Sequence, residues 1–112
     1  MRVPFSFTSR AYDNAEFTVA NATTNYNVKT NQSNLFGGAD SDAGLNVYYV
    51  RIVTDQTVTV RFNSTSNDAI TITSSQSPFV MDEIIEVENI FITNNSGSTA
   101  NMRILTAKPT DK

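Results

Sequence analysis

The feature that most constrains the fold is the period of two among the apolar residues of several short stretches. In TVTVRF, Val58, Val60 and Phe62 alternate with polar residues, and AITIT repeats the pattern with Ile70 and Ile72. Because successive side chains of a β-strand point to opposite faces, this spacing indicates strands with one buried face. No segment shows the 3.6-residue spacing of an amphipathic helix. The chain is therefore expected to be all-β.

Clusters of turn-forming residues separate these stretches. Asn, Ser and Thr make up 39 of the 112 residues, and they favour turns and strand faces because their short side chains compete for backbone hydrogen bonds. This organisation predicts one domain over residues 1–112, an antiparallel β-sandwich or barrel of about eight to nine short strands. The expected strands are 3–8, 16–20, 25–29, 47–53, 57–62, 69–73, 84–87, 89–93 and 101–106.

The stretch IFITNNSGSTANMRIL joins the last two expected strands, and we predict that it forms a hairpin. Ile90 and Ile92 are expected to pair with Met102 and Ile104 as buried residues. The intervening NNSG contains the residue types that turns with positive φ favour. The polar middle of this stretch is therefore interpreted as a turn and not as a binding site.

The composition excludes several kinds of chemistry. The chain contains neither Cys nor His, so disulfides, thiolate metal sites and His-based catalysis are ruled out. Catalysis would have to rest on carboxylates, and one segment contains a run of them. These carboxylates alternate with apolar residues, which is the pattern of a strand with one face in solvent. We therefore assign no catalytic residue and no cofactor. The carboxylates of this run are Asp82, Glu83, Glu86 and Glu88.

The charge distribution limits the partners. The net charge is −3, and the eight Lys and Arg residues are spread singly along the chain, whereas nucleic-acid binding requires a basic patch. No apolar run is long enough to span a membrane, and the first residues lack the apolar core of a signal peptide. We expect neither nucleic acid nor membrane as a partner, and no export by a classical signal.

Apolar residues in otherwise polar surroundings are the candidates for an interface. The segment from about residue 30 to 46 is predicted to be a long loop, and Leu35, Phe36 and Leu45 stand out in it. Phe5 and Phe7 share one face of the first expected strand. That strand is expected either to pair at the edge of its own sheet or to pack as an arm on a neighbouring subunit.

Two local patterns have alternative interpretations. Asp40 and Asp42, followed by Gly44, resemble the start of a calcium loop, but position 51, where such a loop carries Glu, is Arg51, so a solvated turn is the simpler reading. Tyr48 and Tyr49, with Tyr12 and Tyr26, could form a sugar-binding or base-stacking platform. Adjacent Tyr48 and Tyr49 should point to opposite faces, which leaves at most one of them in the core.

From Val47 to Ala107 the sequence contains, in succession, VRFN, AITI, PF, an acidic and apolar stretch, IFITNNSGSTA and MRIL. In this succession the segment resembles small all-β virion proteins of tailed bacteriophages. It covers the C-terminal half of the chain and includes no catalytic motif.

The resemblance implies a jelly-roll or related sandwich on the phage head or at the head-tail junction, as a decoration, cementing or adaptor protein. The implied location is the virion, assembled in the host cytoplasm. The implied partners are the major capsid protein or other virion proteins, and further copies of this chain, with a trimer favoured. The alternative function is a carbohydrate-binding or receptor-binding module on the virion surface.

Overall fold

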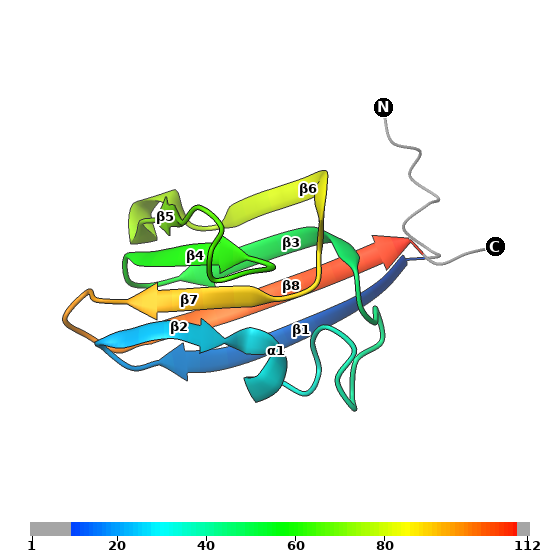
Figure 1. Ribbon diagram of the computed structural model, residues 1–112, viewed down its shortest axis with the longest axis horizontal. Helices are drawn as coiled ribbons and strands as arrows, with labels where there is room; N and C mark the ends of the chain where they lie inside the picture. Colours follow the sequence, from blue (N-terminus) through cyan, green and yellow to red (C-terminus); the bar gives the residue numbers. More distant parts are fainter. Residues whose placement is uncertain (1–9, 110–112) are drawn as a thin grey trace.

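Strands form where the sequence alternates between inward apolar and outward polar side chains. In β4 (Val58–Phe62) the three apolar residues are buried, whereas Thr59 and Arg61 are partly exposed. The computed structural model describes residues 10–109, which contain eight strands and two short helices (Figure 1). The other strands are β1 (Arg10–Val19), β2 (Thr23–Asn27), β3 (Val47–Thr54), β5 (Ile70–Ile72), β6 (Phe79–Val87), β7 (Ile90–Asn94) and β8 (Ala100–Pro109), and the helices are α1 (Val28–Asn31) and the 3₁₀ turn η2 (Ser74–Gln76).

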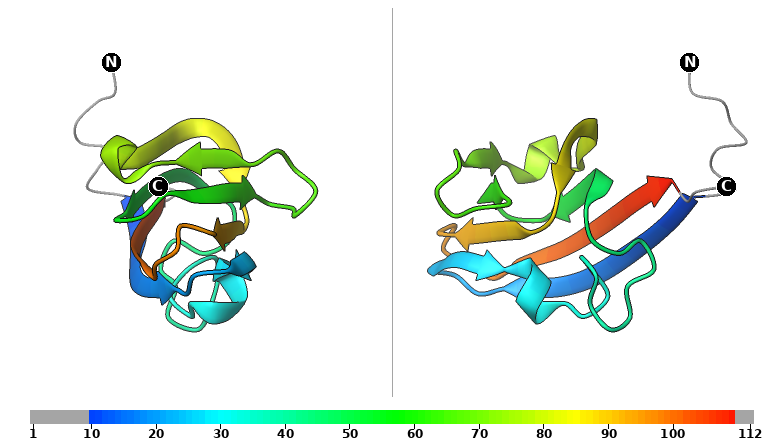
Figure 2. Two further views of the ribbon diagram at one scale, coloured as in Figure 1. Left: turned by 90° about the vertical axis from the view of Figure 1, so that its left-hand side faces the viewer. Right: turned by 45° about the vertical axis from the view of Figure 1, so that its right-hand side comes forward.

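The strands form two four-stranded sheets with the orders β1-β8-β3-β6 and β2-β7-β4-β5, and every pair is antiparallel. Only β4 and β5 are neighbours both in sequence and in a sheet, so every other connection crosses from one sheet to the other. This order of eight strands is that of a jelly roll. The structure confirms the predicted antiparallel sandwich. The turned views in Figure 2 show β1 and β8 running side by side along one side of it.

The apolar core lies between the two sheets. Ile90 and Ile92 of β7 and Met102 and Ile104 of β8 are all buried, as predicted. The predicted hairpin pairing of these residues is wrong, because β7 pairs with β2 and β4 while β8 pairs with β1 and β3. The four side chains therefore come from opposite sheets into one core. A period of two shows which face of a strand is buried, but it does not show which other strand pairs with it.

The N-terminal part of the sandwich differs from the sequence-based expectation. β1 starts at residue 10, six residues before the expected strand, because Ala11, Asp13 and Ala15 continue its inward alternation. A single helical turn, α1, replaces the end of the expected strand 25–29, and Asn27 caps it by accepting a hydrogen bond from the Thr30 N–H. The expected strand 3–8, with Phe5 and Phe7, lies outside the described residues.

Candidate functional site

The outer face of the β1-β8-β3-β6 sheet presents regular rows of side chains. Residues on the opposite face of these strands, such as Ala15, Ile52 and Ile104, are buried in the core, so the residues between them point outward. We call the resulting outer surface the tyrosine face. Its rows, taken across the strands, are Tyr12, Ala107, Tyr49 and Asp82; Asn14, Leu105, Arg51 and Val80; and, over three strands, Glu16, Arg103 and Val53.

Aromatic and aliphatic side chains form much of the tyrosine face. Tyr12 is 61% exposed, and Val80 is also exposed. Between Tyr12 and Tyr49 the small side chain of Ala107 is buried although it lies on the outer side of the sheet. Two tyrosines thus stand on either side of an alanine, about 10 Å apart at the spacing of two strands. A surface with exposed aromatic side chains is suited to docking another surface.

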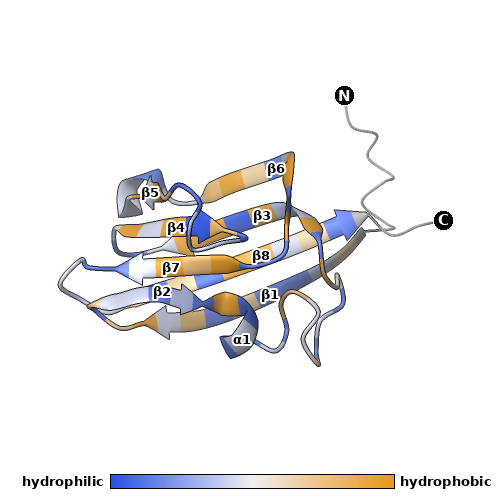
Figure 3. Ribbon diagram, viewed as in Figure 1, coloured by the Kyte–Doolittle hydropathy of each residue, from blue (hydrophilic) through white to orange (hydrophobic). Residues whose placement is uncertain are grey.

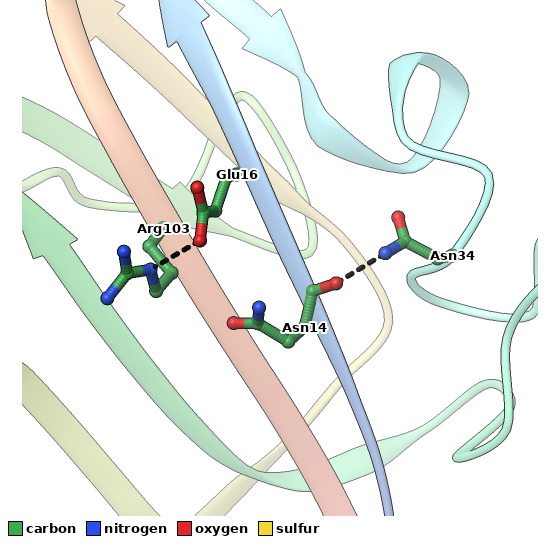
Figure 4. A network of polar contacts seen from close by, with 4 residues as sticks. All are labelled: Asn14, Glu16, Asn34 and Arg103. Atoms are coloured by element: carbon green, nitrogen blue, oxygen red, sulfur yellow. Dashed lines mark hydrogen bonds and ion pairs between the residues drawn. The ribbon is translucent and has the colours of Figure 1, made fainter.

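Charged side chains border the aromatic part of this face. The Arg103 Nε donates to the Glu16 Oε2 at 3.1 Å across the β1-β8 pair, and both side chains are more than half exposed (Figure 4). An exposed ion pair of this kind contributes no more than about 1 kcal/mol to stability. A shallow depression of about 350 Å³ lies around it, lined by Glu16, Phe17, Thr18, Val53, Asn101, Met102 and Arg103.

The outer face of the second sheet is more polar. Thr71, Thr59 and Thr93 form one cross-strand row, and Arg61 lies opposite Phe91 in the next row. The Arg61 side chain is bound, because its Nε donates to the Asn67 carbonyl oxygen at 2.9 Å. The two faces therefore differ in chemistry: the tyrosine face has exposed Tyr12 and half-buried Tyr49, whereas half-buried Phe91 is the aromatic side chain in these rows of the second sheet.

The tyrosines named from the sequence have different environments. A register shift in the β3-β6 pair follows Val47, so Val47 and Val50 are both buried and neither Tyr48 nor Tyr49 enters the core. The Tyr48 hydroxyl donates to the Glu86 Oε2 at 3.2 Å, and the charge of Glu86, followed by this hydrogen bond, raises the pKa of Tyr48. Tyr26 stacks on Phe17 against the core, with ring centroids 5.5 Å apart.

The long loop packs onto the sandwich instead of extending from it. Leu35 and Phe36 are fully buried in the core, so the prediction that they form part of an interface is corrected. Leu45 is 46% exposed and remains an interface candidate. The loop is apolar at these positions because it closes one side of the core.

A carboxylate that sequence reasoning missed holds this loop in place. Asp13 is buried in β1, and it accepts hydrogen bonds from the Ser41 Oγ at 2.8 Å, the Asp42 N–H at 2.6 Å and the Ala43 N–H at 2.9 Å. Both carboxylate oxygens are therefore engaged. The sequence signal was an aspartate at an inward position of the alternation, between Ala11 and Ala15, which is a costly place for a charge without partners.

Asp40 and Asp42, the two candidates for a calcium site, take part in hydrogen bonds that hold the loop. The Asp40 Oδ2 accepts a hydrogen bond from the Ser33 Oγ at 3.0 Å, and Asp42 is exposed while its backbone N–H donates to Asp13. Across residues 10–109 no three His, Cys, Asp or Glu side chains gather in an arrangement that could hold a metal ion. The structure thus brings no further acidic ligand to Asp40 and Asp42.

Two further findings bear on function. Within the part of the chain that the structure describes, no helix has the length and apolar character needed to cross a membrane. No protein-family model matches the chain, and no curated protein matches its sequence.

Proposed function

We propose that this protein is a structural virion protein of a bacteriophage, which binds the assembled head through non-covalent contacts and stabilises it. The observation that carries the proposal is the tyrosine face, a partly aromatic outer surface on a jelly-roll sandwich. Jelly rolls occur in viral capsid proteins and also in lectins and cupins, so the fold alone does not decide between these functions. The resemblance of residues 47–107 to phage virion proteins favours the first.

The chemistry of the described residues favours a docking role over catalysis. The chain has no His and no Cys, and no three of the described carboxylates gather where they could hold a metal ion. Buried Asp13 has its two oxygens engaged by three donors, and Glu86 accepts a hydrogen bond from Tyr48. We therefore take the protein to be a non-enzymatic component whose partner is the major capsid protein or another virion protein.

The size of the tyrosine face indicates how such binding would work. Three rows of outward residues over three to four strands cover an area on the order of 400 Å². A stable protein–protein interface buries about 800 Å² on each partner. One copy would therefore bind weakly through this face alone. Several copies that act together on a symmetric shell would bind tightly by avidity, which agrees with a homo-oligomer, and a trimer is favoured.

The direct test is co-sedimentation of the purified protein with heads of the phage that encodes it. Truncation of a central interface tyrosine commonly costs about 2 kcal/mol, which is roughly a thirtyfold loss of affinity. We expect a loss of this size for Tyr49→Ala and no change for Thr71→Ala, which alters the outer face of the other sheet. A wild-type protein that does not sediment with heads, or a Tyr49→Ala variant that binds as wild type does, would refute the proposal.

A carbohydrate-binding or receptor-binding role on the virion surface is the second candidate. The observation that favours it is the pair of outward tyrosines on either side of Ala107, because aromatic rings can stack on sugars. Tyr26 and Tyr48 are less suited, since one stacks on Phe17 and the other binds Glu86. Binding to a glycan array that disappears in Tyr12→Ala and Tyr49→Ala, together with no binding to heads, would replace the first proposal with this one.

A further inference from the structure

β6 contains an irregular segment that exposes two consecutive isoleucines. The pairing between β3 and β6 leaves residues 83–86 opposite Tyr48 alone. Ile84 is 72% exposed and Ile85 is 41% exposed, whereas in a regular strand one of two neighbours would point into the core. Figure 1 shows β6 bending sharply before the chain enters β7, and in Figure 3 much of β6 has the colour of hydrophobic residues. We call residues 83–86 the isoleucine bulge.

Hydrogen bonds hold the isoleucine bulge in a fixed shape. The Asn63 Nδ2 donates to the Glu86 carbonyl oxygen at 2.9 Å, and the Asn63 Oδ1 accepts from the Glu88 N–H at 2.7 Å. The Asn63 N–H donates to the Asn89 carbonyl oxygen at 2.9 Å. From β3, the Tyr48 hydroxyl donates to the Glu86 Oε2. The bulge is therefore ordered without a partner, and a preorganised segment loses little conformational entropy when it binds.

The surroundings of the isoleucine bulge are acidic. Asp82, Glu86 and Glu88 are exposed, and the sequence from residue 82 to residue 88 contains no Lys or Arg. Exposed isoleucines bordered by carboxylates are complementary to an apolar hollow with basic groups at its rim. Contact between the bulges of two copies would bring like charges together, which is unfavourable.

The depression near the other end of the same sheet can hold the two isoleucine side chains. It is the hollow of about 350 Å³ around the ion pair of Glu16 and Arg103. A cavity of about 150 Å³ holds a benzene molecule, which is larger than one isoleucine side chain. The depression therefore has room for both side chains. Its apolar lining residues are Phe17, Val53 and Met102.

The rim of the depression is more basic than acidic. Arg103 and Glu16 balance each other there as an exposed ion pair. Arg51 lies in the neighbouring row of the same face, is half-buried, and has neither a hydrogen bond nor an ion pair with any residue from 10 to 109. Its neighbours across the strands are apolar, Leu105 on one side and Val80 on the other. One guanidinium beside the depression is thus available to a carboxylate from outside.

The isoleucine bulge and the depression are too far apart to meet within one copy. Tyr48 lies opposite the bulge and Val53 lines the depression, and both residues belong to β3. Their separation along the strand is about 17 Å, at about 3.4 Å per residue. The depression of one copy can therefore be filled only by the bulge of another copy.

We propose that the isoleucine bulge of one copy docks into the depression of a second copy of this chain. Ile84 and Ile85 enter the depression, and the carboxylates beside the bulge approach Arg51. Each copy gives a bulge to one neighbour and receives a bulge from another, and such a contact between different surfaces closes into a ring when its rotation permits. The row with Tyr12 and Tyr49 lies outside the depression. This inference does not depend on binding to phage heads and concerns self-assembly only.

Disulfide trapping between separate chains tests the proposal, because the chain has no native cysteine. The Ile84→Cys variant is mixed with the Val53→Cys variant under mild oxidation. The matched control mixes Val53→Cys with Ile70→Cys, because Ile70 is a 37% exposed isoleucine on an edge strand of the other sheet. We expect a covalent species of twice the 12.3 kDa chain mass that is enriched in the first mixture over the control.

Three other outcomes of the trapping experiment would overturn the proposal. Equal yields in the two mixtures would show that the depression has no preference for the bulge. Faster linkage of either variant with itself than with the other would show contact between like surfaces. A double variant, Ile84→Cys with Val53→Cys, that closes within one chain and forms no multiples of the chain mass would show that the two surfaces meet in a single copy.

Light scattering after size exclusion, at the highest soluble concentration and without phage heads, gives an independent measurement. We expect the wild type to exceed the 12.3 kDa of one chain, and the double variant Ile84→Ser with Ile85→Ser to fall to it. The Ile70→Ser variant should keep the wild-type mass, and circular dichroism checks that each variant is folded. A monomeric wild type, or an unchanged mass after both substitutions in the bulge, would contradict the docking.

Reversal of one charge tests the part played by Arg51. We expect Arg51→Glu to weaken self-association about tenfold, because it places a carboxylate where the acidic surroundings of the bulge approach. The matched control is Lys29→Glu, the same change of charge at an exposed residue of α1. If the two reversals weaken self-association equally, the contact with Arg51 is refuted.

Discussion

Replacement of Asp13 by alanine tests how the long loop is held. The carboxylate accepts hydrogen bonds from Ser41, Asp42 and Ala43, and one such bond to an ionised group contributes about 1.5–3 kcal/mol. The three do not add, because exposed Asp42 and half-buried Ser41 can bind water instead. Ala43 is 1% exposed, so its N–H would lose its partner without access to solvent. We expect Asp13→Ala to lower the free energy of unfolding by about 2–4 kcal/mol.

Urea denaturation followed by circular dichroism measures this loss. With a slope of about 1.5 kcal/mol per molar urea, the midpoint should fall by roughly 1.3–2.7 M. The matched control is Asp40→Ala, which removes an exposed carboxylate that accepts one bond from the Ser33 hydroxyl in the same loop, and we expect a loss below about 1 kcal/mol for it. If the two variants lose the same stability, the anchoring role of Asp13 is refuted.

Three further predictions concern single side chains. Asn94 is fully buried, its Nδ2 donates to two carbonyl oxygens and its Oδ1 accepts one N–H. Asn94→Ala should therefore lower the free energy of unfolding in urea by about 2–4 kcal/mol. The control Asn95→Ala, at an exposed side chain, should change this free energy little. The buried Thr106 hydroxyl has no hydrogen-bond partner among the described residues, so Thr106→Val should raise the unfolding free energy by about 1 kcal/mol, and a loss would contradict this account. The side-chain amide of Asn101, and then its backbone N–H, donate hydrogen bonds to Asp55 and hold the pKa of Asp55 below its ordinary value of 3.8. The stability that these bonds give is therefore present above pH 3.8 and is lost as the pH falls through the lowered pKa. Asp55→Asn should therefore melt below wild type at neutral pH, and the difference should vanish in strong acid.

The strands with regular alternation were predictable because the physical cause is local. Val58, Val60 and Phe62 are buried in β4 as their spacing requires. The start of β1 was missed because Asp13 and Asn14 are turn-forming types, and their place in a strand depends on hydrogen bonds to residues about 30 positions away. Local propensity contains no information about such partners.

The surfaces were harder to predict than the strands. Leu35 and Phe36 were expected at an interface because they interrupt a polar loop, but the sequence does not show that the loop lies over the open side of the core. The tyrosine face was not foreseen as a unit, since Tyr12, Tyr49 and Leu105 come from three strands far apart in the chain. Their assembly depends on the strand order of the sheet, which periodicity does not define.

The position of β8 between β1 and β3 also governs when the tyrosine face can exist during synthesis. β1 and β3 have no direct pairing, and β8 is the last strand of the sandwich to leave the ribosome. Until residues 100–109 have emerged, Tyr12 and Tyr49 lie on strands that nothing holds together. Contacts over such long sequence separations also form slowly. A chain that lacks residues 100–109 therefore cannot present this face, and it cannot compete for a partner that binds it.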